Sequence, residues 1–179
     1  MRIVKQITTN KFLNIKEVND SENNCKGYQF AERKGVDSVA FICYNSKVNP
    51  DNDTYGKFLL NKEYTPPTNE FHFRAFGGSL DKQKSMIDIV KDEIKEECGY
   101  EVVEKKIHEL GKVFVSTQMN QYCYLYLINI LGAKNTGRKP ENKIEAMAET
   151  VWRKEEEIIN GDDWKSISII QKARQKGLL

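Results

Sequence analysis

The stretch GGSLDKQKSMIDIVKDEIKEECGY, residues 77–100, decides the fold of this chain. It opens with Gly77 and Gly78, and two glycines allow the backbone to turn sharply or to approach a ligand closely. Ser79 or Asp81 stands where a residue could cap a following helix. The start of the stretch therefore predicts a tight glycine loop that leads into a helix.

The helix itself is indicated by apolar residues that recur at intervals of three and four. They are Ile87, Val90, Ile94 and Cys98. Gly99 follows at the position where helices commonly end. At about 100° per residue, Glu93, Glu96 and Glu97 fall within an arc of roughly 100° beside the apolar stripe. Three carboxylates so close repel one another unless a cation lies between them, and Mg²⁺ prefers oxygen ligands of this kind. The alternative is a solvated acidic face.

Length and composition indicate a soluble globular protein. A chain of 179 residues, with 39% hydrophobic and 30% charged residues, fits one domain with a sizeable core. The net charge of +2 gives no indication of nucleic-acid or membrane binding. The four cysteines include no CxxC pair, and Cys43, Cys98 and Cys123 lie in apolar or helical runs, so we expect these three to be buried thiols in a reducing compartment. The N-terminus lacks an apolar signal core and no segment approaches ~20 apolar residues. We therefore expect a cytoplasmic protein.

The order of the predicted elements favours an α/β (α+β) fold, in which helices cover a mixed sheet. Short strands are expected over 3–9, 11–18 and 27–33, in an N-terminal subdomain of residues 1–35. The main domain would then span residues 36–179. Its expected elements are a central strand over 36–44, an exposed loop over 45–56, strands over 57–64, 71–76, 101–116 and 121–131, a strand leading into a helix over 144–161, and a final helix over 164–179.

Residues 77–100 resemble the Nudix hydrolase signature. Gly78 matches its first glycine, and the matching helix positions are Glu93, Ile94, Glu96, Glu97, Gly99 and Tyr100. Two positions depart from the signature, because Lys84 replaces a glutamate and Asp92 replaces an arginine. In the family these two side chains form an ion pair that braces the loop against the helix. Since both charges are inverted here, we predict the same brace with reversed polarity. The resemblance also implies the Nudix fold, a mixed sheet between helices.

The resemblance extends to the ADP-ribose pyrophosphatase branch of that family. This branch carries an N-terminal strand subdomain in which an aromatic residue stacks on adenine and an arginine five residues later meets phosphate. Tyr28 and Arg33 have that spacing, and an aromatic face and a guanidinium suit a purine and a diphosphate. The alternative is a core tyrosine with a surface arginine. The branch also implies a two-fold homodimer in which the subdomain crosses to the twin subunit.

Two markers of the branch differ here. An arginine before its Pro-Pro turn is Thr65 in this chain, so Lys62 or Arg74 would supply that phosphate contact. A proline before a later strand is Thr117. The segment around the glycines still resembles the branch, which implies that the carbonyl of Gly77 is a metal ligand.

These resemblances together imply hydrolysis of a nucleoside diphosphate linked to another moiety, with ADP-ribose cleaved to AMP and ribose 5-phosphate as the preferred reaction. Mg²⁺, or alternatively Mn²⁺, would be bound by Gly77, Glu93, Glu96 and Glu97. Catalysis would depend on Glu93, Glu97 and a general base from the loop before residues 151–152, where Glu145 is preferred over Glu141 and Glu149. Two alternatives stay open. One is a sensor that binds an ADP-ribose-like ligand without cleaving it, and the other is a hydrolase of a nucleotide sugar or an oxidised nucleotide.

Overall fold

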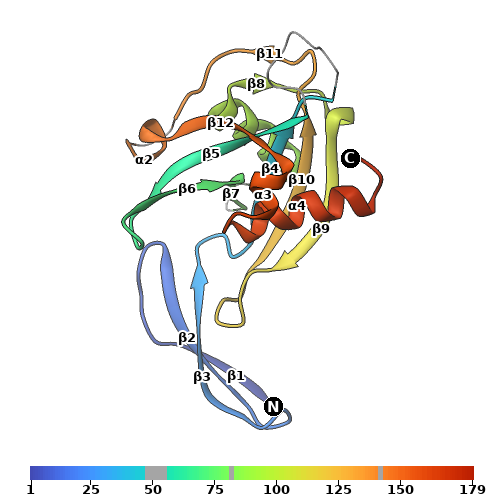
Figure 1. Ribbon diagram of the computed structural model, residues 1–179. Coiled ribbons are helices and arrows are strands. Elements are labelled where there is room, and N and C mark those ends of the chain that lie inside the picture. Colours follow the sequence, from blue (N-terminus) through green and yellow to red (C-terminus); the bar gives the residue numbers. More distant parts are fainter. Residues whose placement is uncertain (47–55, 81–82, 141–142) are drawn as a thin grey trace.

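The computed structural model of the protein describes residues 1–46, 56–80, 83–140 and 143–179. Its N-terminal part is a three-stranded antiparallel sheet in the order β1-β2-β3. The strands are β1 (Arg2–Gln6), β2 (Leu13–Asp20) and β3 (Cys25–Arg33). Figure 1 shows this sheet, in blue, extending away from the body of the molecule.

The body is built on a mixed sheet of seven strands. Its path runs β12-β5-β4-β10-β9, with β6 paired to β5 and β7 paired to β4. The bounds are β4 (Ser38–Tyr44), β5 (Lys57–Thr65), β6 (Glu70–Arg74), β7 (Phe76–Ser79), β9 (Ile107–Phe114), β10 (Tyr122–Asn129) and β12 (Glu149–Lys154). Only β4 and β10 pair in parallel among the described strands, which makes the sheet mixed.

Strand β4 is central because its sequence, SVAFICY, places apolar side chains on both faces of the sheet. Successive strand side chains point to opposite sides of a sheet. Val39, Phe41 and Cys43 accordingly pack into one core and Ala40, Ile42 and Tyr44 into the other. Every residue of the strand is buried.

The two cores are closed by helices on opposite faces of the sheet. One core contains the apolar stripe of α1 (Met86–Glu93) and η1 (Ile94–Cys98), and the other that of α4 (Trp164–Gln175). The remaining elements are β8 (Tyr100–Glu101), η2 (Glu104–Lys106), β11 (Lys134–Asn135), α2 (Lys143–Met147) and α3 (Glu155–Ile159). Figure 1 shows α3 and α4 together on the near face of the sheet. Among the described residues, no helix has the length and apolarity that crossing a membrane requires.

Several predicted elements differ in detail. The glycine pair lies within strand β7, which pairs with β4, so the expected glycine loop is extended backbone. The helix starts later than predicted, with Ser85 as its N-cap in place of Ser79. The segment expected to be a strand followed by a helix begins with the short helix α2. Most of the predicted 45–56 loop, as well as Asp81 and Glu141, lies outside the described residues.

The N-terminal sheet attaches to the body through β3. Ala31 bonds to the segment 116–120 in both directions: its amide donates to the carbonyl of Gln118 at 2.8 Å, and its carbonyl accepts from the amide of Asn120 at 3.1 Å. The hydroxyl of Tyr28 donates to the carbonyl of Thr117 at 2.7 Å. This attachment places the end of β3 beside the main sheet.

Candidate active site

The helix that carries the acidic residues has a defined start and end. The side chain of Ser85 accepts a hydrogen bond from the amide of Asp88, which satisfies a free amide of the first turn. The last turn, η1, is π-helical, a widened geometry that is frequent at functional sites. Gly99 ends it in the left-handed conformation with φ 76°, as the sequence predicts. Glu93 and Glu97 lie four residues apart and so share one face of the helix.

Strand β7 passes directly beneath this face. The amide of Gly77 donates to Oε2 of Glu97 at 2.9 Å. A Cβ at position 77 would lie 2.2 Å from the carbonyl oxygen of Val39, and one at position 78 would lie 2.2 Å from Oε1 of Glu93. Neither glycine has a positive φ. Both glycines are therefore required for close approach, Gly77 to the neighbouring strand and Gly78 to the carboxylate.

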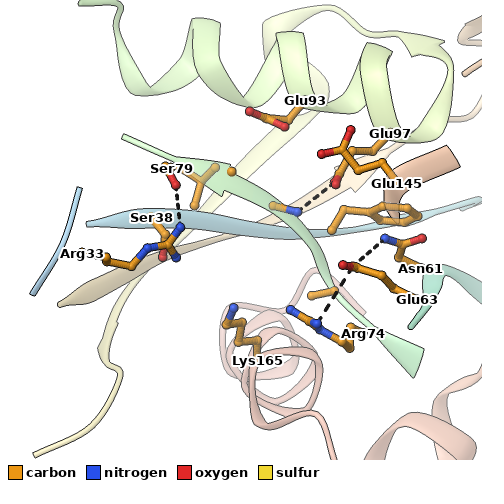
Figure 2. Close-up of a pocket in the computed structure, with 15 residues that line it drawn as sticks. Arg33, Ser38, Asn61, Glu63, Arg74, Ser79, Glu93, Glu97, Glu145 and Lys165 are labelled. Atoms are coloured by element: carbon orange, nitrogen blue, oxygen red, sulfur yellow. Dashed lines mark hydrogen bonds and ion pairs between the residues drawn. The ribbon is translucent and has the colours of Figure 1, made fainter. Parts of the chain in front are cut away.

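A cavity of about 400 Å³ opens between this helix, the main sheet and the start of α4. It is lined by Arg33, Ser38, Val39, Asn61, Glu63, Arg74, Ala75, Phe76, Gly77, Gly78, Ser79, Glu93, Glu97, Glu145 and Lys165. Figure 2 shows the acidic side chains of Glu93, Glu97 and Glu145 on one side, and Lys165 and Arg74 on the other. The cavity is therefore bipolar, with an anionic wall on one side and a mainly cationic wall on the other, where Glu63 lies beside Arg74.

Burial and the repulsion of nearby acids make the ionised form of Glu97, in the anionic wall, unfavourable. The pKa of Glu97 is raised from 4.5 to about 8, chiefly by desolvation; the hydrogen bond from Gly77 opposes the rise, and the negative charges of Glu93, Glu145 and Glu63 add to it. Carboxyl groups that share a site in this way favour either a bound proton or a bound cation.

The cationic wall consists of Arg33, Arg74 and Lys165. Arg33, at the end of β3, donates from Nη2 to Oγ of Ser79 at 2.7 Å. Arg74 Nη1 lies 3.4 Å from Oγ1 of Thr65 and 4.0 Å from a carboxylate oxygen of Glu63. Lys165 lies in the first turn of α4, and its ammonium makes no ion pair within the described part of the chain. These cations leave donors available for an anionic ligand.

Six of the predicted site residues thus line one cavity. They are Gly77, Glu93, Glu97, Glu145, Arg33 and Arg74. Three others, Glu96, Tyr28 and Lys62, do not. Glu96 precedes Glu97 by one residue and so lies off the face that Glu97 shares with Glu93. Tyr28 lines a separate hollow beside Thr117.

Lys62 faces away because strand side chains alternate. Its neighbours Asn61 and Glu63 line the cavity, whereas its ammonium lies 3.5 Å from a carboxylate oxygen of Glu149. The alternation of β5 was the available signal for Asn61 and Glu63, which the sequence analysis missed. Lys165 was also missed, and it enters the cavity only because α4 docks on the sheet.

The predicted brace between Lys84 and Asp92 is confirmed. Nζ of Lys84 lies 2.6 Å from Oδ2 of Asp92. The hydrogen bond to Asp92 and its charge raise the pKa of Lys84. The inverted charges therefore join the residues before α1 to the helix itself.

The residues of the anionic wall fit a hard divalent cation by donor type. They offer only carboxylate and backbone oxygens, which Mg²⁺ prefers, and a cation would offset both the burial of the Glu97 carboxylate and the nearby charge of Glu93. Within the described ranges, however, no three His, Cys, Asp or Glu side chains are drawn together as a metal cluster.

Comparisons with known proteins identify the fold. Neither a protein-family model nor a curated protein sequence matches this chain. Solved structures do match, and one is described as the crystal structure of ADP compounds hydrolase. It is similar over 98% of this chain and 93% of its own, with a TM-score of 0.71 and 13% sequence identity. The predicted α+β fold with a mixed sheet is therefore confirmed, and this likeness shows the fold alone.

Proposed function

We propose that this chain is a Nudix-type hydrolase that cleaves a nucleoside diphosphate linked to another moiety, with ADP-ribose as the preferred substrate. The observation that carries the proposal is the bipolar cavity, in which the carboxylates of Glu93 and Glu97 face a wall of cations. Such a cavity suits a substrate whose diphosphate is bound by metal on one side and by cationic side chains on the other. The likeness to an ADP compounds hydrolase supports the same class of substrate.

In this proposal Glu93, Glu97 and the carbonyl of Gly77 hold Mg²⁺, with Mn²⁺ as an alternative. The bound ion would neutralise charge on the phosphoryl oxygens and lower the pKa of a water molecule. Arg33 and Arg74 donate hydrogen bonds to phosphate oxygens and fix the diphosphate for in-line attack.

The carboxylate of Glu145 accepts a proton from the attacking water. The oxygen of that water forms a new bond to one phosphorus, and the bond from this phosphorus to the bridging oxygen breaks. For ADP-ribose the products are AMP and ribose 5-phosphate.

We further propose a division into a strand subdomain (1–35) and a hydrolase domain (36–179), and a homodimer formed through the subdomain. Apolar side chains are exposed on its strands and the loop that joins them: Ile3, Val4, Ile7, Phe12 and Leu13. An exposed apolar surface of this kind favours burial against another chain. Tyr28, 43% exposed, would then be available near one active site of the dimer.

A substrate panel tests the hydrolase proposal. Purified protein is incubated with ADP-ribose, a nucleotide sugar and an oxidised nucleoside triphosphate, each with Mg²⁺, Mn²⁺ or EDTA, and phosphate-containing products are separated. We expect AMP and ribose 5-phosphate from ADP-ribose with metal only. Faster release from another substrate would reassign the substrate, and product formation in EDTA would refute the metal requirement.

A ligand sensor is the second candidate, and it is favoured because the described residues contain no group of three acidic, His or Cys side chains placed to hold a metal ion. It predicts that ADP-ribose binds, as measured by calorimetry, without any product forming in the presence of Mg²⁺.

A further inference from the structure

The segment 136–139 lies against the C-terminal end of η1. The amide of Thr136 donates to the carbonyl of Gly99 at 2.7 Å, and the amide of Lys139 donates to the carbonyl of Glu96 at 2.9 Å. A Cβ at Gly99 would lie 2.7 Å from the carbonyl carbon of Gly137 and 2.8 Å from the amide nitrogen of Arg138. The backbone of this segment is therefore fixed to the helix end that carries Glu97.

From this fixed backbone, the guanidinium of Arg138 reaches three carbonyl groups. Nε donates to the carbonyl of Glu97 at 2.7 Å, Nη2 donates to the carbonyl of Glu145 at 3.1 Å, and Nη1 donates to the carbonyl of Ala148. Glu97 belongs to η1, whereas Glu145 and Ala148 lie in and directly after α2. One planar group thus joins the two elements that supply acids to the cavity.

We infer that Arg138 is a positioning residue, which holds the backbone of Glu145 in a fixed place relative to Glu97. This inference rests on the proposed function, since it assigns Glu145 a role that depends on placement. α2 has only five residues, Lys143–Met147. A helix of one turn or so has little stability of its own, so the three bonds from the arginine contribute to fixing its position.

An arginine is required for this role. Its guanidinium presents five donors in a rigid plane, so three carbonyls in different directions can be bonded at once. A lysine at position 138 would keep the charge but could not keep the three directed bonds. Arg138→Lys therefore distinguishes the two roles: a purely electrostatic role would survive this substitution, whereas a positioning role would not.

The first experiment is kinetic and compares Arg138→Ala, Arg138→Lys and the matched control Arg174→Ala. Arg174 is a solvent-exposed arginine of α4 that pairs with Glu155, away from the cavity. For both Arg138 variants we expect kcat to fall about 10- to 100-fold, as for other residues that orient a functional side chain, with KM changed less than kcat. Low millimolar guanidinium should restore part of the rate to Arg138→Ala and none to Glu145→Gln.

The second experiment is hydrogen exchange, which does not depend on activity. In Arg138→Ala, and in Arg138→Lys if the first variant is insoluble, amides of residues 143–148 should exchange faster while those of Ile89 and Val90 in the core stay protected. A uniform loss of protection, or unchanged exchange over 143–148, would overturn the inference. So would an unaltered kcat in an active enzyme. A wild-type protein without activity would refute the proposed function and leave the exchange result to decide on Arg138.

Discussion

The carboxylate of Glu93 packs against Gly78. A Cβ at position 78 would lie 2.2 Å from Oε1 of Glu93. We expect Gly78→Ala to displace this carboxylate, because the flexible end of a glutamate moves more easily than the backbone. Turnover should fall on the order of 100-fold, as expected when a catalytic group is shifted by about 1 Å. The melting temperature should change little.

Gly77→Ala is the matched comparison, because its Cβ would meet the carbonyl oxygen of Val39 in β4 and not a side chain. Here the paired strands must separate, so we expect a loss of roughly 1–3 kcal/mol in the free energy of unfolding. Chemical denaturation of both variants measures this. Equal stability losses in the two variants would contradict the distinct roles given to the two glycines.

Glu97 is expected to be essential for turnover. Its carboxylate accepts a hydrogen bond from Gly77 at 2.9 Å and is surrounded by other acids, which is the setting of a metal ligand. Glu97→Gln should leave the fold intact and reduce kcat by orders of magnitude. A folded variant with nearly the full rate would show that the metal ligands lie elsewhere.

The same substitution should make the metal-free protein more stable at alkaline pH. The pKa of Glu97 is raised from 4.5 to about 8 in the folded state, mainly by burial. Between these values the folded protein holds a proton that the unfolded chain has released, so stability falls as the pH rises. Glu97→Gln removes this loss, which amounts to at most about 5 kcal/mol above pH 8.

Urea denaturation in EDTA at pH 4.5, 6.5 and 8.5 measures this difference. It should be near zero at the lowest pH and largest at the highest, and Mg²⁺ should reduce it by stabilising the wild-type protein. A difference that is independent of pH would contradict the raised pKa.

The brace between Lys84 and Asp92 can be tested by charge exchange. Lys84→Glu alone places two carboxylates together and should lower the melting temperature, whereas Lys84→Glu with Asp92→Arg should restore it. The coupling free energy of the double-mutant cycle is the quantity to measure. A coupling of zero would mean that the 2.6 Å contact has no energetic role.

Lys165 is expected to bind phosphate oxygens. Lys165→Met should raise the KM for a diphosphate substrate about 10- to 100-fold, the range of a charge-assisted hydrogen bond, with a smaller effect on kcat. Lys172→Met, on the same helix but outside the cavity, is the control. An unchanged KM in the Lys165 variant would remove it from the binding wall.

Assembly through the N-terminal strands is tested in the full-length chain. Ile3→Asp with Phe12→Asp should dissociate a dimer without unfolding it, because these side chains are 51% and 63% exposed in the single chain. Deleting residues 1–34 should give a monomer or insoluble protein with lower substrate affinity. Sedimentation at micromolar concentration is the measurement, and a monomeric wild-type protein would refute the proposal.

Local patterns predicted what lies close in the sequence. The buried positions of Val90, Ile94 and Cys98, as well as the end of the helix at Gly99, follow from helical periodicity and were correct. The pairing of Lys84, before α1, with Asp92, near its end, was also accessible, because both charges are inverted together relative to the signature that the stretch resembles.

What the sequence could not provide depends on packing between distant elements. The role of Gly78 in approaching Glu93 exists only because β7 lies beneath α1. Lys165 reaches the cavity only through the docking of α4, which no spacing in the sequence indicates. The placement of Tyr28 beside Thr117 likewise depends on a contact between residues 89 positions apart.

The contact between Tyr28 and Thr117 also affects when the N-terminal strands can dock during synthesis of the chain. Tyr28 leaves the ribosome before Thr117, which follows 89 residues later, a delay of roughly 4–18 seconds at ordinary synthesis rates. During this interval the three strands have no body to dock on, and a small isolated sheet is marginally stable. Strands β1–β3 are therefore synthesised well before the segment on which they dock, and nascent-chain chaperones would meet them with their apolar residues exposed.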